Sequence, residues 1–540
     1  MKRGAIAKQS LTGACGVFTC LLMVACEQGL PAGELTSEVN SPRAVQSPSW
    51  EAPTQPVPVA QPPLVSQPGP EAEAPEAEAP EAAPPAQAPQ PPPPASQPPA
   101  PPPPTQPQAP EPTGQSWFVS PSGSQGGRGT RASPLKTLSQ AVAAARPGDT
   151  IRVLPGVYSE QLTLESRGAN AAAITIRGEG TPLPTIVPSS TRRSAVIIAR
   201  GRYHLENLHI DLGGAAMAAV VFERTASNSR LIGSELHGGT AGAGVLVSGA
   251  ANITIENNTI HHFIKPRDDS HGVLVVGPSR KVTIRGNDIH DNSGDSVQCQ
   301  ASGDQPADEV MIEGNTLHDE GENAVDIKRC HRVTVRNNEM SGFPNTARRP
   351  GGSSAGEAVV IHEAARTIVI QGNLISQAGR GVSVVGGSAI PEDLRILGNT
   401  IQDIRNVPAG NGQGIRIEVA RNVQVADNVI QDTASYGLMV AADGKVVSGL
   451  TVRYNTLRGG PQQLLLRLGH ELHRPGSLLR GNRYRRGGIL KGDGVAEKLG
   501  GVHAPYRGKF SGEQLTLSSS EKLEAWRSVL GVDQDSWLQD

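Results

Sequence analysis

One short frame with an asparagine at its fourth position recurs through the second half of this 540-residue chain. The frame consists of an apolar residue, two variable residues, the asparagine, one variable residue and a second apolar residue, as in IENNTI. Self-similarity at intervals of 23 to 35 residues marks a stacked repeat, and the short alternating segments between Gly, Asp and Asn predict coils of a parallel β-solenoid. The frame contains Asn258, Asn287, Asn315, Asn338, Asn373, Asn399, Asn428, Asn455 and Asn482, and Asn207 and Ser234 extend it backwards.

Asparagine suits a bend between two stacked strands. It tolerates the left-handed αL conformation, so each repeated Asn is expected to hold that conformation itself. Stacked at a coil spacing of about 4.8 Å, the side chains can hydrogen-bond to one another along the axis. The pattern resembles the right-handed parallel β-helix of pectate lyases and related carbohydrate-active proteins, which implies this fold over residues 116–540. Lyases, hydrolases, epimerases and non-catalytic spikes share that fold, so the resemblance implies no single chemistry.

The first 25 residues have the features of an export signal. Lys2, Arg3 and Lys8 precede an apolar stretch that is too short to span a membrane. The stretch ends LMVAC, which resembles a bacterial lipobox and implies that Cys26 is the first mature residue and carries lipid. By the same resemblance Glu27 implies the outer membrane. Ordinary signal cleavage beside a chance cysteine is the alternative.

Residues 26–115 form a linker rich in Pro, Ala and Glu, with runs such as PEAEAPEAEAP. Such a composition cannot bury a core and predicts an extended, disordered spacer. The linker holds ten acidic residues and one basic residue, so the folded part is slightly basic although the whole chain has a net charge of −2. That slight positive charge suits binding of an acidic polysaccharide and is too small for a nucleic-acid-binding surface. We expect the protein to be a monomer. Aromatic residues make up only 3% of the chain, which argues against a stacking cleft for neutral glucans.

Both ends of the folded domain predict caps, which a solenoid needs to protect its terminal coils. The segment from Pro134 to Ala145 has a helical apolar period, with Ser133 as a predicted N-cap. It resembles the N-terminal cap of secreted β-helix polysaccharide lyases. Near the C-terminus, Leu515 to Ser536 predicts a strand followed by a helix at about 519–530. Beyond Cys26 only Cys299 and Cys330 remain, and their different heights along the strand predict no disulfide.

The strand after each asparagine bend can be aligned across coils by the pattern small-Val-x-Val. Alternation then predicts that Val273, Val297, Val325 and their successors point inward, whereas the intervening residues point outward. The outward positions gather polar groups of both signs on three successive coils, with Arg380, Arg416 and Glu418 just beyond, and blander coils flank them, which is typical of a functional site. The group contains Asp295, Gln298, Gln300, Asn323, Asp326, Lys328, Glu357, His362, Arg380, Arg416 and Glu418.

Two insertions flank the same region, at 261–271 and 341–357, and are expected to form the walls of a cleft. They bring in Arg267, Arg348 and Arg349, whose guanidinium groups suit carboxylate recognition. We predict that Gln298, Gln300, Asn323, Arg380 and Arg267 bind substrate.

The pair Asp326 and Lys328 predicts the chemistry. A crowded lysine can lose its proton near neutrality and act as a base, and β-elimination from a uronate needs a base and a cation. The grouping resembles β-helix lyases for pectate and for chondroitin or alginate that pair Ca²⁺ with a catalytic lysine. That resemblance implies Lys328 as the base. We predict His362 and Arg416 as further catalytic residues, and the carboxylates of Asp295, Asp326 and Glu357 as oxygen ligands for Ca²⁺. The aspartate run of pectate lyases lacks one Asp here, and Glu320-Gly321-Glu322 is only a partial echo of the chondroitinase Glu-x-Glu.

The leading functional hypothesis is a surface-anchored lyase acting on a uronate polysaccharide. A non-catalytic carbohydrate-binding or adhesion solenoid is the main alternative. An epimerase would need a second proton donor, for which His362 is the candidate, and a hydrolase would need two carboxylates, for which Asp295 and Asp326 are candidates. The His-Asp pairs at His290 and His318 are interpreted as bend residues. The sequence has no HExxH or CxxC motif, so zinc-protease and thiol chemistries lack support.

Overall fold

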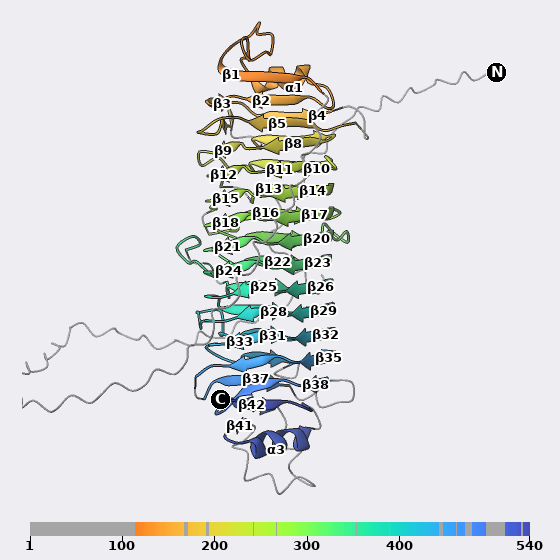
Figure 1. Ribbon diagram of the computed structural model, residues 1–540, viewed down its shortest axis with the longest axis vertical. Coiled ribbons are helices and arrows are strands. Elements are labelled where there is room, and N and C mark those ends of the chain that lie inside the picture. Colours follow the sequence, from red (N-terminus) through yellow and green to blue (C-terminus); the bar gives the residue numbers. More distant parts are fainter. Residues whose placement is uncertain are drawn as a thin grey trace, which may run out of the picture. The chain divides into compact units, whose positions relative to one another are not determined.

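A computed structural model describes residues 114–540 except 167–170, 191–193, 241, 266, 351, 353, 388, 442–446, 461, 470–477, 493–513 and 531–532. The signal sequence, Cys26 and nearly all of the linker lie outside the described residues and stay predictions. The coils stack along one axis as a β-helix, as the sequence predicts (Figure 1). Their strands form three sheets of 14 strands each, which run along that axis. Among the described residues, no helix is both long and apolar enough to cross a membrane.

The first sheet leads into the asparagine bends. Its strands, in spatial order, are β1 (Ser116–Ser124), β2 (Thr150–Val153), β5 (Ile174–Gly178), β8 (Tyr203–Glu206), β11 (Arg230–Ile232), β14 (Ala251–Glu256), β17 (Arg280–Arg285), β20 (Asp308–Glu313), β23 (His331–Arg336), β26 (Arg366–Gln371), β29 (Glu392–Leu397), β32 (Ala420–Ala426), β35 (Val447–Arg453) and β38 (Leu478–Arg480).

The third sheet follows those bends with short strands. They are β3 (Val157–Ser159), β6 (Thr185–Val187), β9 (His209–Asp211), β12 (Glu235–His237), β15 (Thr259–His261), β18 (Asp288–His290), β21 (Thr316–His318), β24 (Glu339–Ser341), β27 (Leu374–Ile375), β30 (Thr400–Ile401), β33 (Val429–Gln431), β36 (Thr456–Arg458), β39 (Arg483–Arg485) and β42 (Trp537–Gln539).

The second sheet carries the aligned strands of the candidate site. They are β4 (Leu162–Glu165), β7 (Val196–Arg200), β10 (Val220–Thr225), β13 (Ala243–Ser248), β16 (His271–Val276), β19 (Val297–Gln300), β22 (Val325–Lys328), β25 (Glu357–Ile361), β28 (Arg380–Val384), β31 (Ile415–Ile417), β34 (Leu438–Val440), β37 (Leu464–Leu468), β40 (Ile489–Gly492) and β41 (Gln514–Thr516). The last strand, β41, pairs antiparallel with β40 and closes the sheet.

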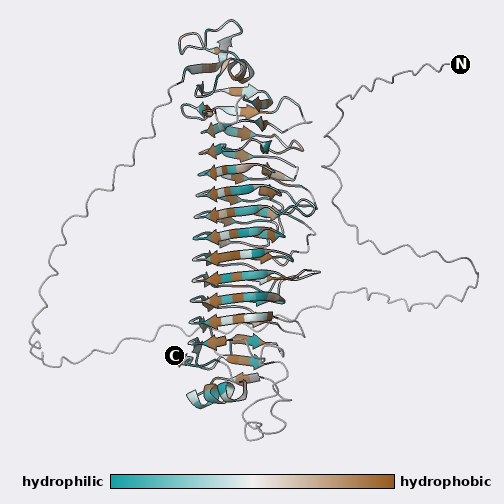
Figure 2. Cartoon of the chain, turned by 90° about the vertical axis from the view of Figure 1, so that its right-hand side faces the viewer, coloured by the Kyte–Doolittle hydropathy of each residue, from teal (hydrophilic) through white to brown (hydrophobic). Residues whose placement is uncertain are grey.

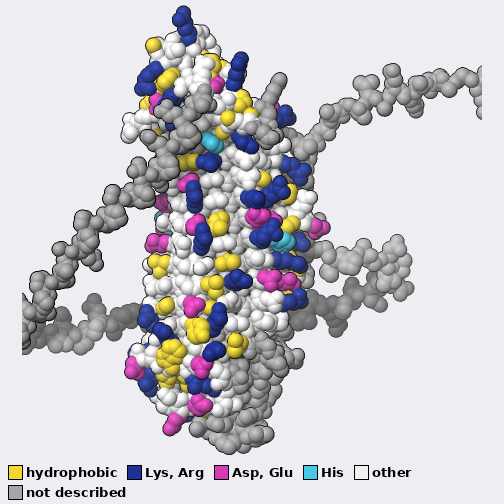
Figure 3. Space-filling view, turned by 45° about the vertical axis from the view of Figure 1, so that its right-hand side comes forward, with side chains coloured by type: hydrophobic (Ala, Val, Ile, Leu, Met, Phe, Trp, Pro, Cys, Tyr) yellow, Lys and Arg dark blue, Asp and Glu magenta, His cyan; other side chains and the backbone are white. Residues whose placement is uncertain are grey.

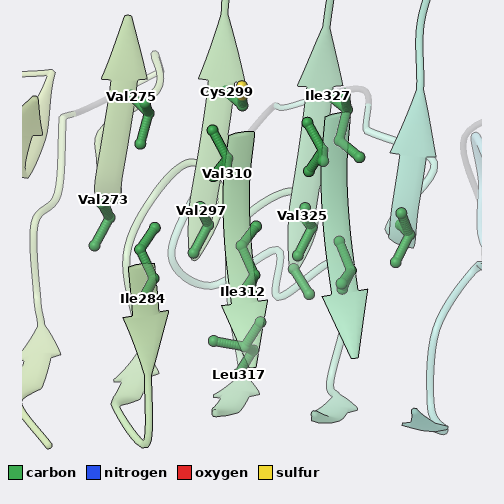
Figure 4. Close-up of a cluster of buried hydrophobic side chains, with 14 of the residues drawn as sticks. Val273, Val275, Ile284, Val297, Cys299, Val310, Ile312, Leu317, Val325 and Ile327 are labelled. Carbon is green, nitrogen blue, oxygen red and sulfur yellow. The ribbon is translucent and has the colours of Figure 1, made fainter. Parts of the chain in front are cut away.

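The register of the second sheet confirms the sequence alignment. Val273 pairs with Val297, Val297 with Val325, and Val325 with Val359. All four side chains are fully buried, and those of Val273, Val297 and Val325 lie across the solenoid from residues of the first sheet such as Ile284 and Ile312 (Figure 4). The alternation of apolar and polar residues along each strand is visible in Figure 2. One-sided burial fixes the register, because a slip by one residue would turn every apolar side chain outward.

The repeated asparagines form one buried hydrogen-bonded ladder at the bend between the first and third sheets. In each rung, one asparagine Oδ1 accepts both the backbone N–H and the side-chain amide of the preceding asparagine. Asn287 N and Nδ2 both lie 2.9 Å from Asn315 Oδ1, for example. The ladder runs from Ser234 to Asn482, whose backbone N–H donates to Ser536 Oγ in the C-terminal segment.

Two details of the asparagine prediction are wrong. The αL conformation belongs to the residue before each ladder position, such as Asn257, Gly286 or Gly314, because the ladder residue itself must turn its side chain into the stack. Asn207 is one of these αL residues, and the ladder position beside Ser234 is taken by Leu208. Asn207 therefore shares the conformation of the bend but not the hydrogen bonds of the ladder.

The caps are present, with one boundary moved. The N-terminal helix α1 covers Leu138–Ala144 and begins later than predicted, because Thr137 and Gln140 form a reciprocal capping box there. Leu135, predicted to be helical, instead bridges to the first strand. The C-terminal helix α3 covers Ser520–Leu530, as predicted.

A disulfide joins Cys299 and Cys330, contrary to the prediction. Cys299 lies on β19 opposite Ile327, whereas Cys330 follows three residues later, in the turn after β22. The chain changes direction in that turn, so the two Cα atoms come within 6.4 Å and both cysteines are buried. Strand alignment alone could not show this, because the turn, not the strand, brings Cys330 back toward Cys299.

The charged surface is mixed. Figure 3 shows Lys and Arg side chains interspersed with Asp and Glu along the visible face, with no patch of one sign. On the first sheet many of these charges pair between coils, as in Arg285–Glu256 at 2.9 Å and Arg421–Glu392 at 2.8 Å. Such exposed pairs contribute about 0 to 1 kcal/mol each, so they indicate a solvated face rather than a site.

Candidate functional site

The predicted polar group does lie together on the outer face of the second sheet, from β19 to β31. Gln298 pairs with Asp326, and Gln300 with Lys328, on neighbouring strands. Asp326 is followed in the same column by Val360, Ser383 and then Arg416. The sequence alignment therefore placed these residues correctly along the solenoid.

Asp326 connects the two most accessible polar groups of the cluster. Its Oδ2 lies 2.8 Å from Lys328 Nζ, and its Oδ1 lies 3.2 Å from His362 Nε2 on the next coil. The side chain of Asp326 is only 3% exposed, whereas those of Lys328 and His362 are 37% and 36% exposed. Oδ1 has no hydrogen bond of good geometry, so His362 is near but not locked. A buried carboxylate thus holds an ammonium and an imidazole side by side at the surface. We call Asp326, Lys328 and His362 the central triad.

The charge state of Lys328 differs from the prediction. Burial of the ammonium group lowers its pKa, but the carboxylates of Asp326 and Asp295 raise it more, so the pKa of Lys328 lies above its ordinary value. Lys328 is therefore a cation at neutral pH. Crowding by acids outweighs desolvation here, and the prediction of a readily deprotonated lysine base is wrong.

Asp295 occupies a closed hydrogen-bonded position rather than an open one. It is fully buried and accepts hydrogen bonds from Gln298 Nε2 at 3.1 Å and Asn323 Nδ2 at 2.9 Å, and its Oδ2 lies 3.1 Å from His271 Nδ1. Although burial opposes ionisation, the hydrogen bond and charge of His271 hold the pKa of Asp295 below its ordinary value. Asp295 is therefore an ionised anchor for its neighbours.

The arginines of the cluster are also paired. Arg380 donates to Glu357 Oε1 at 2.7 Å and to Gln413 Oε1 at 3.2 Å, and its side chain is only 11% exposed. Arg416 forms an ion pair with Glu418. These arginines therefore organise the face beside the central triad.

The two insertions contact each other near the start of the site. Arg348 pairs with Asp291 at 2.7 Å, and Arg349 bridges Asp269 of the first insertion and Glu322. Arg348 and Arg349, predicted to recognise substrate carboxylates, are thus engaged within the protein. Arg267 is an exposed loop residue in the αL conformation.

The three predicted Ca²⁺ ligands do not form a ligand cluster among the described residues. Asp295 is held by His271 and two amides, Asp326 by Lys328, and Glu357 by Arg380. Ca²⁺ takes six to eight oxygen ligands, and Asp326 Oδ1 is the one fully buried oxygen of these carboxylates without a hydrogen bond of good geometry. The arrangement does not fit a Ca²⁺ site built on these residues, and no step below depends on one.

Of the predicted substrate-binding residues, Gln300 has the most suitable position. It is half-buried at the outer end of β19, directly opposite Lys328. Gln298, Asn323 and Arg380 instead support the acids beneath the surface. Two shallow hollows on the first sheet, one lined by Asp393 and Arg395, lie away from the central triad. We therefore place the candidate site at Asp326, His362 and Lys328, which group an acid, a base and a cation, and not at the hollows of the first sheet.

Glu320 is a buried ionisable residue whose position the sequence did not reveal. It is fully buried under the turn before β22, where it accepts hydrogen bonds from Asn292 N, Asn292 Nδ2 and Ser296 Oγ. Burial raises its pKa to about 8. In the sequence, Glu320 directly follows the His318-Asp319 pair, which was interpreted as a bend. Only the folded turn, in which Asp319 is αL, shows that the Glu320 side chain points inward. Glu320 and Glu322 therefore do not form a paired acidic motif: one is interior and the other pairs with Arg349.

Comparison with known proteins supports the architecture. A family model described as "Right handed beta helix region" matches residues 194–347 and 271–463, together half of the chain. A second model, "Protein of unknown function (DUF1565)", matches residues 121–165. The uncharacterized protein YwoF of Bacillus subtilis (strain 168) is 37% identical over 60 residues, which span 11% of this chain and 13% of that protein.

Solved structures with a similar fold have several activities. The surface adhesin PfbA of Streptococcus pneumoniae is 11% identical over 66% of this chain and 87% of its own, with a TM-score of 0.46. The mannuronan C-5 epimerase AlgE4 A-module of Azotobacter vinelandii is 16% identical over 62% and 91%, with a TM-score of 0.41. The alginate lyase AlyGC of family PL6 is 14% identical over 65% and 50%, with a TM-score of 0.48. These values assign no activity, but the family match is decisive for architecture: the chain belongs to the right-handed β-helix family.

Proposed function

We propose that the chain is a polysaccharide-active protein that cleaves a uronate polymer by β-elimination at the central triad. The predicted lipid anchor at Cys26 would hold it at the outer surface of the cell. The observation that carries the proposal is the buried Asp326 carboxylate, which places a lysine cation and a histidine side by side at the surface. β-Elimination needs both a base for the proton at C5 and a positive group for the uronate carboxylate.

The roles follow from the charge states. Lys328 stays protonated, so it binds the uronate carboxylate and stabilises the negative charge that develops there. His362 faces Asp326 with Nε2, which leaves Nδ1 as the ring nitrogen available to a substrate. Asp326 is a positioning residue, because it contacts Lys328 and His362 rather than the reacting atoms.

The elimination consumes no water, and its protons and electrons balance as follows. His362 Nδ1 takes the C5 proton, and the electron pair of that C–H bond forms the double bond between C4 and C5. The C4–O bond breaks, its electron pair leaves with the glycosidic oxygen, and that oxygen takes up a proton from the imidazolium. The 3.2 Å contact between His362 and Asp326 is expected to tighten when substrate is bound, as catalytic hydrogen bonds often do.

A non-catalytic carbohydrate-binding or adhesion solenoid is the second candidate. The observation that favours it is the internal pairing of Arg348, Arg349, Arg380 and Arg416, which leaves few charged groups to a transition state. A hydrolase is less well supported, because Asp295 is fully buried and bound by His271. An epimerase would use the same base as the lyase and would differ in its product.

We expect the full chain to release an unsaturated uronate, detected by ultraviolet absorbance, from at least one of polygalacturonate, alginate or chondroitin. Replacing His362 by Ala should lower kcat by about 10²- to 10⁴-fold, the usual contribution of a general base. His331→Ala, on the opposite first sheet, should retain wild-type turnover. Binding without turnover on every polymer would support the adhesion candidate, and wild-type turnover by His362→Ala would exclude this base.

A further inference from the structure

A row of stacked histidines lies outside the central triad, on the outer face of the third sheet. His209, His237, His261, His290 and His318 occupy successive coils, with ring centroids 4.7 to 5.1 Å apart. The chain has 13 histidines in all, so this one face holds a large share of them. Stacking alone accounts for the spacing, because it equals the repeat of the coils.

One end of the row has the partners of a metal site. Asp288, His290 and His318 present ligand atoms that all lie within 4.8 Å of one another. Asp288 and His290 are two residues apart on β18 and so share its outer face, and His318 lies beside His290 on β21. His318 Nε2 is 3.1 Å from Asp288 Oδ1. The Asp288 side chain is half exposed, so this part of the group is open to solvent.

The remaining ring nitrogens are already oriented. His290 Nδ1 lies 2.9 Å from Asp291 Oδ2, and His318 Nδ1 lies 2.8 Å from Asp319 Oδ2. A carboxylate on Nδ1 fixes the proton there and leaves the Nε2 lone pair for a metal, an arrangement common around protein zinc ions. The αL conformation of Asp291 and Asp319 holds both carboxylates in this position. The His-Asp pairs are therefore bend residues, as predicted, and also orient the two imidazoles.

We propose that Asp288, His290 and His318 bind a first-row transition metal ion, with Zn²⁺ as the best match. Two imidazoles and one carboxylate are a common zinc ligand set, and three protein ligands leave a fourth position open for water or another group. Ligand distances of about 2.0 to 2.2 Å require the three groups to close around the ion, which the exposed Asp288 side chain can do by rotation. The site is on the third sheet and is independent of the proposed lyase chemistry.

A second group, His209, Glu235 and His237, has the same residue types but different contacts. Its two Nε2 atoms lie 2.7 Å apart and face each other as a hydrogen-bonded pair. Asp211 is 3.8 Å from His237 Nδ1, and His209 Nδ1 faces the hydroxyl of Thr185, so neither ring has a close carboxylate. The group at Asp288 is therefore the better-oriented site, and the second group provides an internal comparison.

Calorimetric titration of the metal-free full chain with ZnCl2 tests the proposal. Wild-type protein should bind Zn²⁺, and His318→Ala and Asp288→Asn should each lower the affinity at least 100-fold. Asp319→Asn, which leaves all three ligands in place, should weaken binding about 10- to 100-fold. His331→Ala and His209→Ala should keep wild-type affinity, and circular dichroism should show that every variant retains its β-structure.

Any one of the following binding results would overturn the proposal. They are no heat of binding in wild-type protein, unchanged affinity in His318→Ala, and loss of binding in His209→Ala alone. A purely structural role for the His-Asp pairs would make Asp319→Asn less stable without changing its affinity for Zn²⁺, and that result would also contradict the proposed site.

Discussion

Replacing Asn315 by Ala is expected to lower the free energy of unfolding by about 3 to 5 kcal/mol. Asn315 Oδ1 accepts two hydrogen bonds from Asn287, and its Nδ2 donates to Ile284 O and Asn338 Oδ1. The side chain is buried, so the variant leaves several polar groups without partners, at about 1 to 3 kcal/mol for each group that water cannot reach.

Two measurements check this prediction. The urea midpoint should fall, and hydrogen exchange at the backbone amide of Asn287 should accelerate, because that amide donates directly to Asn315. Asn411→Ala, at an exposed loop position, should change stability by no more than about 0.5 kcal/mol. A loss below about 1 kcal/mol in Asn315→Ala, with unchanged exchange at Asn287, would show that the ladder does not stabilise the bends.

Glu320 is expected to make the protein less stable as the pH rises from about 5 to 8. Its pKa is about 8 in the folded protein, because burial favours the neutral acid, whereas a glutamate in an unfolded chain titrates near 4.5. Between these values the folded state binds more protons than the unfolded state, so its advantage is complete below about 4.5 and is lost as the pH passes 8. The shift corresponds to a loss of up to about 5 kcal/mol across that range.

Glu320→Gln isolates this effect, since Gln has the same shape and stays neutral at every pH. Its Nε2 can only donate, so the lost accepted hydrogen bond lowers stability by an amount that does not depend on pH. Burial lowers the pKa of His204, His261 and His262, which makes stability rise with pH below about 6.5 and so opposes the glutamate. The difference between wild-type and Glu320→Gln unfolding curves removes that contribution. Glu339→Gln, on the exposed face of β24, should retain the wild-type profile. A Glu320→Gln variant with the same slope as wild type would contradict the buried neutral acid.

The sequence predicted the features that periodicity controls. The parallel β-helix, the inward columns and the heights of the outward residues that pair between strands follow from alternation and from the burial of one face. The asparagine frame located the bends, but the αL residue is its neighbour, because the frame marks the hydrogen-bonded position rather than the strained one. Asn207 fitted the composition of the frame and not its register.

The partners of side chains in turns and loops could not be predicted in the same way. Cys330, Glu320 and Arg349 lie where the chain changes direction, so strand alignment does not say what they contact. The charge of Lys328 was wrong for a related reason: desolvation and carboxylate proximity act in opposite directions, and only distances decide which is larger. The histidine row was present in the sequence as one residue per coil, but its Nδ1 contacts to Asp291 and Asp319 depend on the αL turns.

The most direct test of the proposed lyase compares Lys328→Ala with Lys328→Arg in the ultraviolet assay for unsaturated uronate. If Lys328 acts as a cation, Lys328→Ala should lose about 10²- to 10³-fold in kcat/KM, while Lys328→Arg keeps activity within about tenfold of wild type. Lys281→Ala, an exposed lysine on the first sheet, should match wild type. Equal inactivity of Lys328→Ala and Lys328→Arg would instead show that a removable proton on Lys328 is required, and full activity of Lys328→Ala would contradict any role for the central triad in elimination.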